Sequence, residues 1–183
     1  MGKGRSTIEL IILGILQEKS MSAYEVVQYM EVRQIERLVK ISKPSVYKIC
    51  KRLYKEEYLT GKIVREGENP EKIIYSVNKK GQTLFLDLMQ YFSGNIQPFF
   101  FDFNCFLWNI EKLEKKQALE MLLSLKAEFK QWAHWIIVHE KEVQNAPFSV
   151  RMIVKQYRMT IHTMLDWIKE VVIEFKRNKI NQD

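Results

Sequence analysis

Basic and hydroxyl-bearing side chains recur along residues 43–55 at a spacing that suits phosphate binding. They are Lys43, Ser45, Tyr47, Lys48, Lys51, Arg52 and Lys55. Between them runs an apolar stripe with helical periodicity, made of Val46, Ile49, Cys50 and Leu53. Cationic groups on one face of a helix bind the phosphates of nucleic acid, and hydroxyl groups add hydrogen bonds. A solvated charged face is the alternative, and the neighbouring elements decide between the two.

The elements around this segment favour the first interpretation. Lys43-Pro44 predicts a helix start, where proline is tolerated and where the Ser42 oxygen is placed to cap the first amides. Two strand-like runs follow at 59–65 and 72–77, joined by the turn-rich residues 66–71. A short basic helix followed by a β-ribbon is the pattern of a winged helix-turn-helix, which places the helix in the DNA major groove. Arg65 and Lys72, beside the turn, are therefore predicted to contact DNA with the seven side chains above.

Two further helices are predicted upstream, so the basic helix is the third. The first covers the Ile- and Leu-rich residues 8–16. The second begins at Ser22-Ala23-Tyr24-Glu25, and it turns either Tyr24, Val27 and Met30 or Val26 and Met30 inward. Three helices followed by a ribbon is the element order of the winged helix, whose third helix recognises DNA.

At this point the chain resembles the PadR family of bacterial transcriptional regulators over nearly its whole length. The matching motifs are Leu13-Gly14-Ile15-Leu16, Ser22-Ala23-Tyr24-Glu25, Ser42-Lys43-Pro44-Ser45-Val46-Tyr47, Lys51-Arg52-Leu53, and the run from Lys72 through Tyr75 to Gly81. The chain departs from the family at Ala23 and at Glu57-Tyr58, where the family usually has glycine. The acidic Glu66, Glu68 and Glu71 also predict a weaker phosphate contact by the wing than is typical.

The charge distribution supports a nucleic-acid partner for the first half of the chain. Residues 1–92 carry 16 basic and 11 acidic side chains, and residues 93–183 carry 13 and 11, within a total net charge of +7. No apolar run approaches the length of a membrane-spanning helix, and the first residues do not resemble a secretory signal. We therefore expect a cytoplasmic protein that does not associate with membranes.

The chain contains no pattern that predicts catalysis, a metal site or a cofactor. Phosphate-binding glycine loops, nucleophile elbows and zinc-binding histidine pairs are missing from the sequence. The three histidines, His134, His139 and His162, lack carboxylates or thiols at ligand spacing. Cys50 and Cys105 are expected to be reduced thiols in the two cores. These observations exclude the common enzyme classes that short motifs identify.

The second half is predicted to be a helical domain, with residues 1–93 forming the DNA-binding domain and 94–183 a dimerisation domain. A fourth helix at about 79–92, a linker at 94–98 and an aromatic helix at 99–108 precede two long helices. The first long helix has a seam of Ala118, Leu122, Leu125, Phe129, Trp132 and Ile136. After a break at 145–147, the second has Val150, Val154, Tyr157, Ile161, Met164, Ile168, Val171 and Phe175.

The two long helices are expected to form an antiparallel hairpin that pairs with a second copy of the chain. Apolar residues off the seams, among them Trp135, Ile137, Ile153 and Leu165, need a further surface to cover them. The predicted dimer interface consists of Tyr157, Ile161, Met164, Ile168, Val171 and Phe175. The resemblance is closest to the PadR subfamily with a large helical C-terminal domain, the virulence-activator type, which dimerises through that domain.

All four tryptophans lie in the second half, which raises the question of a ligand. Relatives in the resembled family respond to phenolic acids or flat hydrophobic compounds. Trp108, Trp132, Trp135 and Trp167 are therefore candidates for an aromatic effector site. The alternative, which we favour, is that they serve the core and the interface.

The sequence therefore predicts a mainly α protein that binds double-stranded DNA as a homodimer and regulates transcription, with a repressor favoured over an activator. Two alternatives stay open. A helical interaction adapter whose winged helix binds protein would not bind duplex DNA in a salt-sensitive way. A bundle-type enzyme that binds a small molecule would need polar or metal-binding residues in the bundle core, where the predicted seams are apolar.

Overall fold

The chain divides into two compact units. The computed structural model describes residues 6–37, 39, 41–65, 71–96, 98 and 100–177 of the 183-residue chain. Contacts between Cα atoms separate Met1–Pro98 from Phe99–Asp183. The predicted boundary after residue 93 falls in the last turn of helix α4, Lys79–Gly94. The division thus lies in the predicted linker, a little later in the chain than the predicted boundary.

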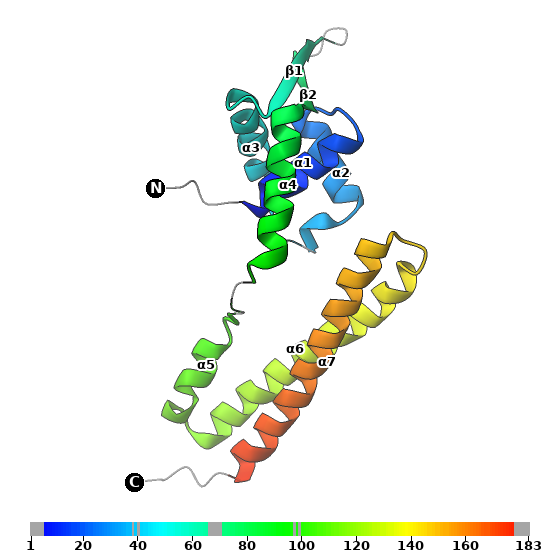
Figure 1. Cartoon of the computed structure of the whole chain (residues 1–183). Helices are drawn as coiled ribbons and strands as arrows, with labels where there is room; N and C mark the ends of the chain where they lie inside the picture. Colours follow the sequence, from blue (N-terminus) through cyan, green and yellow to red (C-terminus); the bar gives the residue numbers. More distant parts are fainter. Residues whose placement is uncertain are drawn as a thin grey trace. The chain divides into compact units, whose positions relative to one another are not determined.

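The N-terminal unit has the element order of a winged helix-turn-helix (Figure 1). It contains α1 (Thr7–Glu18), α2 (Ala23–Val32), a 3-10 turn (Ile35–Arg37) and α3 (Lys43–Lys55). Strands β1 (Leu59–Val64) and β2 (Lys72–Val77) and helix α4 follow. The predicted mainly α fold with a two-stranded wing is confirmed, and α3 is the predicted third helix.

Capping boxes define the starts of the first two helices. The Ser6 amide donates to the Glu9 carboxylate at 3.3 Å. The Ser22 amide donates to Glu25 at 2.7 Å, and the Glu25 amide donates to the Ser22 hydroxyl at 3.3 Å. Each pair satisfies amides that have no partner within their own helix. Both helix starts are therefore fixed by local sequence.

One apolar core holds the N-terminal unit together. Its most buried members come from four helices, α1 to α4, and the ribbon: Ile12, Leu13, Ile15, Leu16, Val26, Val27, Met30, Val46, Cys50, Leu53, Leu59, Tyr75 and Leu88. Of the residues predicted to face inward from α2, Val26, Val27 and Met30 do so. Tyr24 is 59% exposed, so its predicted burial is wrong. It occupies the first turn of α2, where Val26 and Val27 already cover the core side.

The ribbon is antiparallel, and β2 also pairs with Met21 in the loop before α2. Leu59 pairs with Val77 at its base and Val64 with Lys72 at its outer end. The Met21 amide donates to the Tyr75 carbonyl at 3.2 Å, and the Tyr75 amide donates back at 2.9 Å. This bridge attaches the wing to the helical core, because it links β2 to the segment between α1 and α2.

Helix α3 ends in a left-handed turn at a residue that is not glycine. Glu57 has φ 61°. Its amide donates to Tyr54 at 3.1 Å, and the Tyr58 amide donates to Leu53 at 2.9 Å. This pair of hydrogen bonds is the Schellman motif, in which glycine is the usual residue. Although Glu57 stands where the family usually has glycine, the left-handed turn is retained, and the side chain of Glu57 makes its backbone conformation strained.

The C-terminal unit consists of α5 (Asn104–Asn109), a second 3-10 turn (Ile110–Lys112) and two long helices, α6 (Lys115–Glu142) and α7 (Phe148–Arg177). Helices α6 and α7 run side by side in opposite directions, which confirms the predicted antiparallel hairpin (Figure 1). The predicted helix at 99–108 is too long, because α5 begins only at Asn104. Turn hydrogen bonds precede it, from the Asn104 amide to Phe101 at 3.0 Å and from the Cys105 amide to Asp102 at 3.1 Å.

The hairpin buries its apolar residues in two small clusters. One contains Ile110, Ala118, Leu122, Ile168, Val172 and Phe175, and the other Ala133, Ile136, Val154 and Ile161. The predicted seam of α6 is wrong at Trp132, which is 62% exposed, while its neighbour Ala133 is buried. A small residue at this point lets the two helix backbones approach, and the bulky indole lies outside. In the part of the chain that the structure describes, no helix is long and apolar enough to span a membrane.

Candidate nucleic-acid interface

Helix α3 has one buried stripe and one exposed basic face. Val46, Cys50 and Leu53 are buried in the core, as the sequence predicts. Ser42 precedes the helix, but its hydroxyl hydrogen-bonds the Ser45 hydroxyl at 2.7 Å rather than a helix amide. The predicted side-chain cap is therefore wrong, and the Ser42 carbonyl instead accepts the first intrahelical bond, from the Ser45 amide at 3.0 Å.

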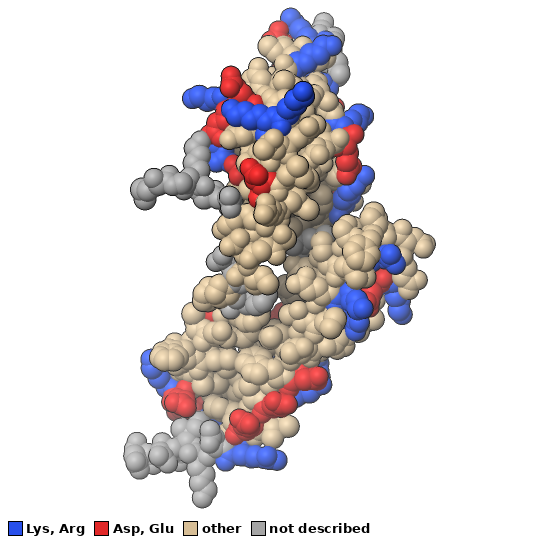
Figure 2. Space-filling view, viewed as in Figure 1, with Lys and Arg blue, Asp and Glu red and all other residues tan. Residues whose placement is uncertain are grey.

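The basic face of α3 presents most of the predicted DNA-binding side chains to solvent. Exposed residues are Lys43, Tyr47, Lys48, Lys51 and Lys55, and Ser45 is half-buried. Figure 2 shows Lys and Arg side chains around the ribbon at the top of its view, with acidic side chains among them. Lys48, Lys51 and Lys55 lie on the outer side of a helix that its buried stripe anchors, so they are accessible to a phosphate backbone, whereas Lys43 forms an ion pair with Glu31.

Arg52 is turned away from the other cations. Its guanidinium group forms an ion pair with the Glu9 carboxylate of α1, in which Glu9 is 12% exposed and Arg52 32%. Its Nε atom is buried and has no hydrogen-bond partner in the structure. Glu9 also accepts from the Ser6 amide, so one carboxylate joins the start of α1 to α3. We therefore assign Arg52 a structural role and leave it out of the candidate interface.

The two predicted wing residues differ in their surroundings. Arg65 is exposed just after β1. Lys72, at the start of β2, is half-buried, and its ammonium lies 3.6 Å from the Glu25 carboxylate of α2. Of the acidic residues predicted to weaken the wing, Glu71 is exposed, whereas Glu66 and Glu68 lie outside the described residues.

The ribbon packs closely on the end of α3. A Cβ atom at Gly61 of β1 would lie 2.8 Å from the Tyr54 ring of α3 and 2.8 Å from the Ile73 side chain. The Tyr54 ring also meets the Tyr75 ring edge to face, with 5.7 Å between their centres. Only glycine at 61 leaves room for this contact, which sets the distance between the basic helix and the wing. This contact cannot be predicted from the sequence, because no local pattern links Tyr54 to Gly61.

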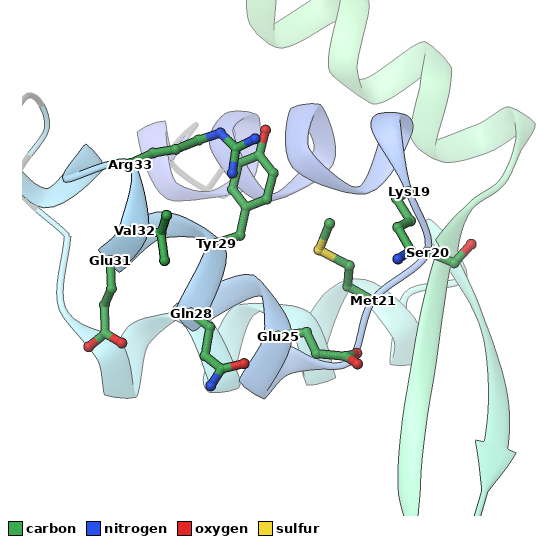
Figure 3. Close-up of a pocket in the computed structure, with 9 residues that line it drawn as sticks. All are labelled: Lys19, Ser20, Met21, Glu25, Gln28, Tyr29, Glu31, Val32 and Arg33. Carbon is green, nitrogen blue, oxygen red and sulfur yellow. The ribbon is translucent and has the colours of Figure 1, made fainter.

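A surface hollow of about 480 Å³ lies beside α2, between the end of α1 and the end of α2 (Figure 3). Its lining combines both charges with a few apolar groups: Lys19, Ser20, Met21, Glu25, Gln28, Tyr29, Glu31, Val32 and Arg33. Arg33 lies over the Tyr29 ring, 3.6 Å from its centre. The Tyr29 hydroxyl donates to Glu18 at 2.6 Å. These groups bind one another, so the hollow does not converge on one ligand.

The two cysteines occupy different environments. Cys50 is buried in the core, and this burial raises the pKa of its thiol to about 12. It is therefore an uncharged packing group at neutral pH. Cys105 on α5 is exposed, so its predicted place in a core is wrong. Among the described residues, no cluster of His, Cys, Asp and Glu could hold a metal ion.

The four candidate effector residues do not meet in one place. Trp108 on α5 is 86% exposed. Trp135 stacks on His139, with 5.0 Å between ring centres. Trp167 instead joins an aromatic cluster with Phe103 and Phe129, at 5.6 and 6.5 Å. Trp132 is also exposed and lies three residues before Trp135 on α6, so these two indoles are neighbours, whereas Trp108 and Trp167 lie on other helices.

The predicted dimer residues fall into two groups. Ile161, Ile168 and Phe175 are buried within the chain's own hairpin. Met164 and Val171 are half-buried, and Tyr157 is exposed. The first group has little surface left for a partner. Large apolar side chains elsewhere on the hairpin are exposed: Met121, Leu123, Trp132, Trp135, Ile137, Val138, Phe148, Met152, Met159 and Ile173.

Comparison with known proteins agrees with this architecture. The chain's fold is similar to that of Bacillus subtilis PadR in complex with operator DNA, at 15% identity and a TM-score of 0.77, covering 94% of this chain and 99% of that one. The structure of the same protein in complex with p-coumaric acid is similar at 14% identity and a TM-score of 0.74, covering 93% of this chain and 99% of that one. The Vibrio cholerae virulence activator AphA is similar at 16% identity and a TM-score of 0.65, covering 93% of this chain and 99% of that one.

These likenesses concern the fold, whereas a family model matches the sequence itself. No curated protein sequence matches the chain. Residues 12–86, which run from α1 into α4 and include α3 and the ribbon, match the model of the Transcriptional regulator PadR-like family. The winged-helix unit of this chain therefore belongs to the PadR-like family of transcriptional regulators.

Proposed function

We propose that the protein is a transcriptional regulator that binds double-stranded DNA through α3 and the ribbon. The observation that carries this proposal is the basic face of α3, where Lys48, Lys51 and Lys55 are exposed above a fully buried stripe. The PadR-like match over residues 12–86 supports it. A similarly folded protein, Bacillus subtilis PadR, has been solved with operator DNA. In this arrangement α3 enters the major groove, and Arg65 lies near the flanking backbone.

The regulator acts as a homodimer in this proposal. The exposed apolar side chains of α6 and α7 support a second copy as their cover, because contiguous apolar surface of this kind marks an interface. Figure 2 shows broad areas of the hairpin without charged side chains. Two copies related by a two-fold axis place two α3 helices on a pseudo-palindromic operator.

Repression relieved by a small aromatic compound is the mode of regulation that we propose. The support is the similarly folded PadR solved with p-coumaric acid, together with Trp108, Trp132 and Trp135 on the surface. Planar acids stack on indole rings. If the compound favours one arrangement of the dimer and DNA another, each weakens the binding of the other by the same factor.

Salt-dependent binding to duplex DNA tests the central proposal. The affinity of the full chain for a random-sequence duplex is measured at several salt concentrations, together with Lys51→Ala. Loss of one phosphate contact is expected to flatten the log–log salt dependence by about one unit. Lys116→Ala on α6 removes the same charge in the other unit and serves as the control. Salt-independent or undetectable duplex binding would favour the protein-binding adapter instead.

Titration with p-coumaric acid tests the proposed regulation. Quenching of tryptophan fluorescence is expected, and the compound should lower the affinity for DNA. Quenching without any change in DNA affinity would indicate binding that is not coupled to regulation.

A further inference from the structure

We infer that two glutamates of α2, Glu25 and Glu31, restrain sequence-independent DNA binding by pairing with lysines of the DNA-contacting elements. The inference rests on the proposed function and identifies a control of its sequence-independent affinity for DNA. Glu31 forms an ion pair with Lys43 at the start of α3. Glu25 lies 3.6 Å from Lys72 at the start of β2. One helix thus holds a cation of both the recognition helix and the wing.

The placement of α2 makes this double contact possible. The helix packs against both α3 and β2. Figure 3 shows Glu25, Gln28 and Glu31 along the lower edge of α2 in its view. The two carboxylates therefore lie beside the predicted DNA contacts rather than on an unrelated surface.

Helix stability does not explain the carboxylate at Glu31. It lies in the last turn of α2, next to Val32, where the helix dipole disfavours negative charge. Its partner in the structure is Lys43, which is 69% exposed and would otherwise be free for phosphate. Hydrogen bonding to Glu31 also raises the pKa of Lys43 above its ordinary value, in keeping with a favourable interaction between the two groups. The two groups therefore form a charged pair at the rim of the interface.

Glu25 combines this pairing with a structural task. Its carboxylate accepts from the Ser22 amide at 2.7 Å and from the Ser22 hydroxyl at 2.8 Å. Hydrogen bonds from Ser22 are the main reason that the pKa of Glu25 is lowered, with a smaller contribution from Lys72. Glu31 is therefore the better residue for a test, because its substitution leaves the capping box intact.

Pairing of this kind affects the two modes of DNA binding unequally. Sequence-independent binding depends almost entirely on cations that neutralise phosphates. A lysine held by a carboxylate must exchange one anion for another, and the freed carboxylate then lies close to the DNA. Contacts to base edges do not incur this cost. The glutamates therefore lower the affinity for any duplex, and the loss is the largest share of the binding free energy where phosphate contacts supply nearly all of it.

Glu31→Gln tests the inference with the full chain and a random-sequence duplex. The variant is expected to bind about two- to fivefold more tightly than the wild type, as for the loss of one exposed ion pair. Its log–log salt dependence should be steeper, because Lys43 then neutralises a phosphate without leaving a free carboxylate. Glu120→Gln, an exposed glutamate of α6, makes the same change in net charge and should bind like the wild type.

A double-mutant cycle with Lys43→Ala shows whether the effect passes through the pair. The gain from Glu31→Gln should be smaller in the Lys43→Ala background, where removal of the carboxylate relieves only its repulsion from phosphate. Equal affinities of Glu31→Gln and Glu120→Gln would overturn the inference, and so would a gain that is the same with and without Lys43. A wild type that binds no duplex at all would instead refute the proposed function, so the two failures are distinguishable.

Discussion

The two units of this chain treat their apolar and charged residues differently. The N-terminal unit gathers its large apolar side chains into one core and leaves lysines on the surface of α3. The C-terminal hairpin divides its buried residues between two small clusters, and it exposes Trp132, Phe148 and Met159. A unit that buries its apolar side chains is suited to a charged partner, whereas the hairpin has apolar surface suited to a protein partner. The difference agrees with the proposal that the N-terminal unit binds DNA and that the hairpin binds another copy of the chain.

Introducing an aspartate at either of two positions of the hairpin is expected to have the largest effects. The two variants distinguish a core position from a surface position. Ile168→Asp puts a carboxylate at a fully buried site, where an unpaired charge costs several kcal/mol. We expect loss of the hairpin's helical structure, measured by circular dichroism. Trp132→Asp changes an exposed residue and should keep the helices while weakening the dimer, measured by sedimentation.

These two variants also revise the expectation from the sequence alone, which placed Ile168 in the dimer interface. A folded but monomeric Ile168→Asp variant would restore that expectation. An unchanged dimer in Trp132→Asp would exclude this part of the exposed surface from the interface.

Gly81→Ala tests the packing of the N-terminal unit. An added Cβ would lie 2.2 Å from the Tyr58 carbonyl oxygen and 2.9 Å from the Val77 side chain, and backbone does not yield easily. We expect the free energy of unfolding of the N-terminal unit to fall by about 2–3 kcal/mol. Gly94→Ala, at the end of the same helix, meets nothing within 4 Å and is the matched control. Denaturant unfolding of both variants measures the difference, and equal stabilities would contradict the geometry.

Arg52→Met sharpens the distinction between structural and DNA-binding cations within α3. The substitution keeps an apolar stem but leaves Glu9 without its partner, so we expect a loss of about 1–2 kcal/mol in stability. The salt dependence of DNA binding should stay the same, in contrast to Lys51→Ala. Glu9→Gln is the matched variant on α1 and should destabilise in the same way. A flatter salt dependence for Arg52→Met would mean that the guanidinium contacts DNA after all.

Local sequence patterns predicted the secondary structure elements better than they predicted which side chains contact one another in the fold. The basic helix, the ribbon and the hairpin follow from periodicity and turn residues, which act over short distances. The pairing of Arg52 with Glu9 spans 43 residues of sequence, and periodicity carries no information about it. The burial of Ala133 instead of Trp132 depends on how closely two helices approach, which a seam pattern does not specify. The sequence therefore indicated which side chains are basic, and the structure shows which of them are already paired.

Glu57→Gly is the smallest expected effect and tests how α3 ends. A side chain in the left-handed region costs about 1 kcal/mol, and glycine removes that strain at the price of a more flexible unfolded chain. Glu57 also loses its carboxylate contact with Lys80 at 3.6 Å, but both groups are exposed and the pair contributes little. We expect a net gain of about 0.5–1 kcal/mol in the stability of the N-terminal unit. Glu56→Gly, at the preceding residue with φ −87°, has no such strain to relieve and should give no gain. Equal responses at the two positions would mean that the left-handed turn is not a source of strain, and that glycine is common there in the family for another reason.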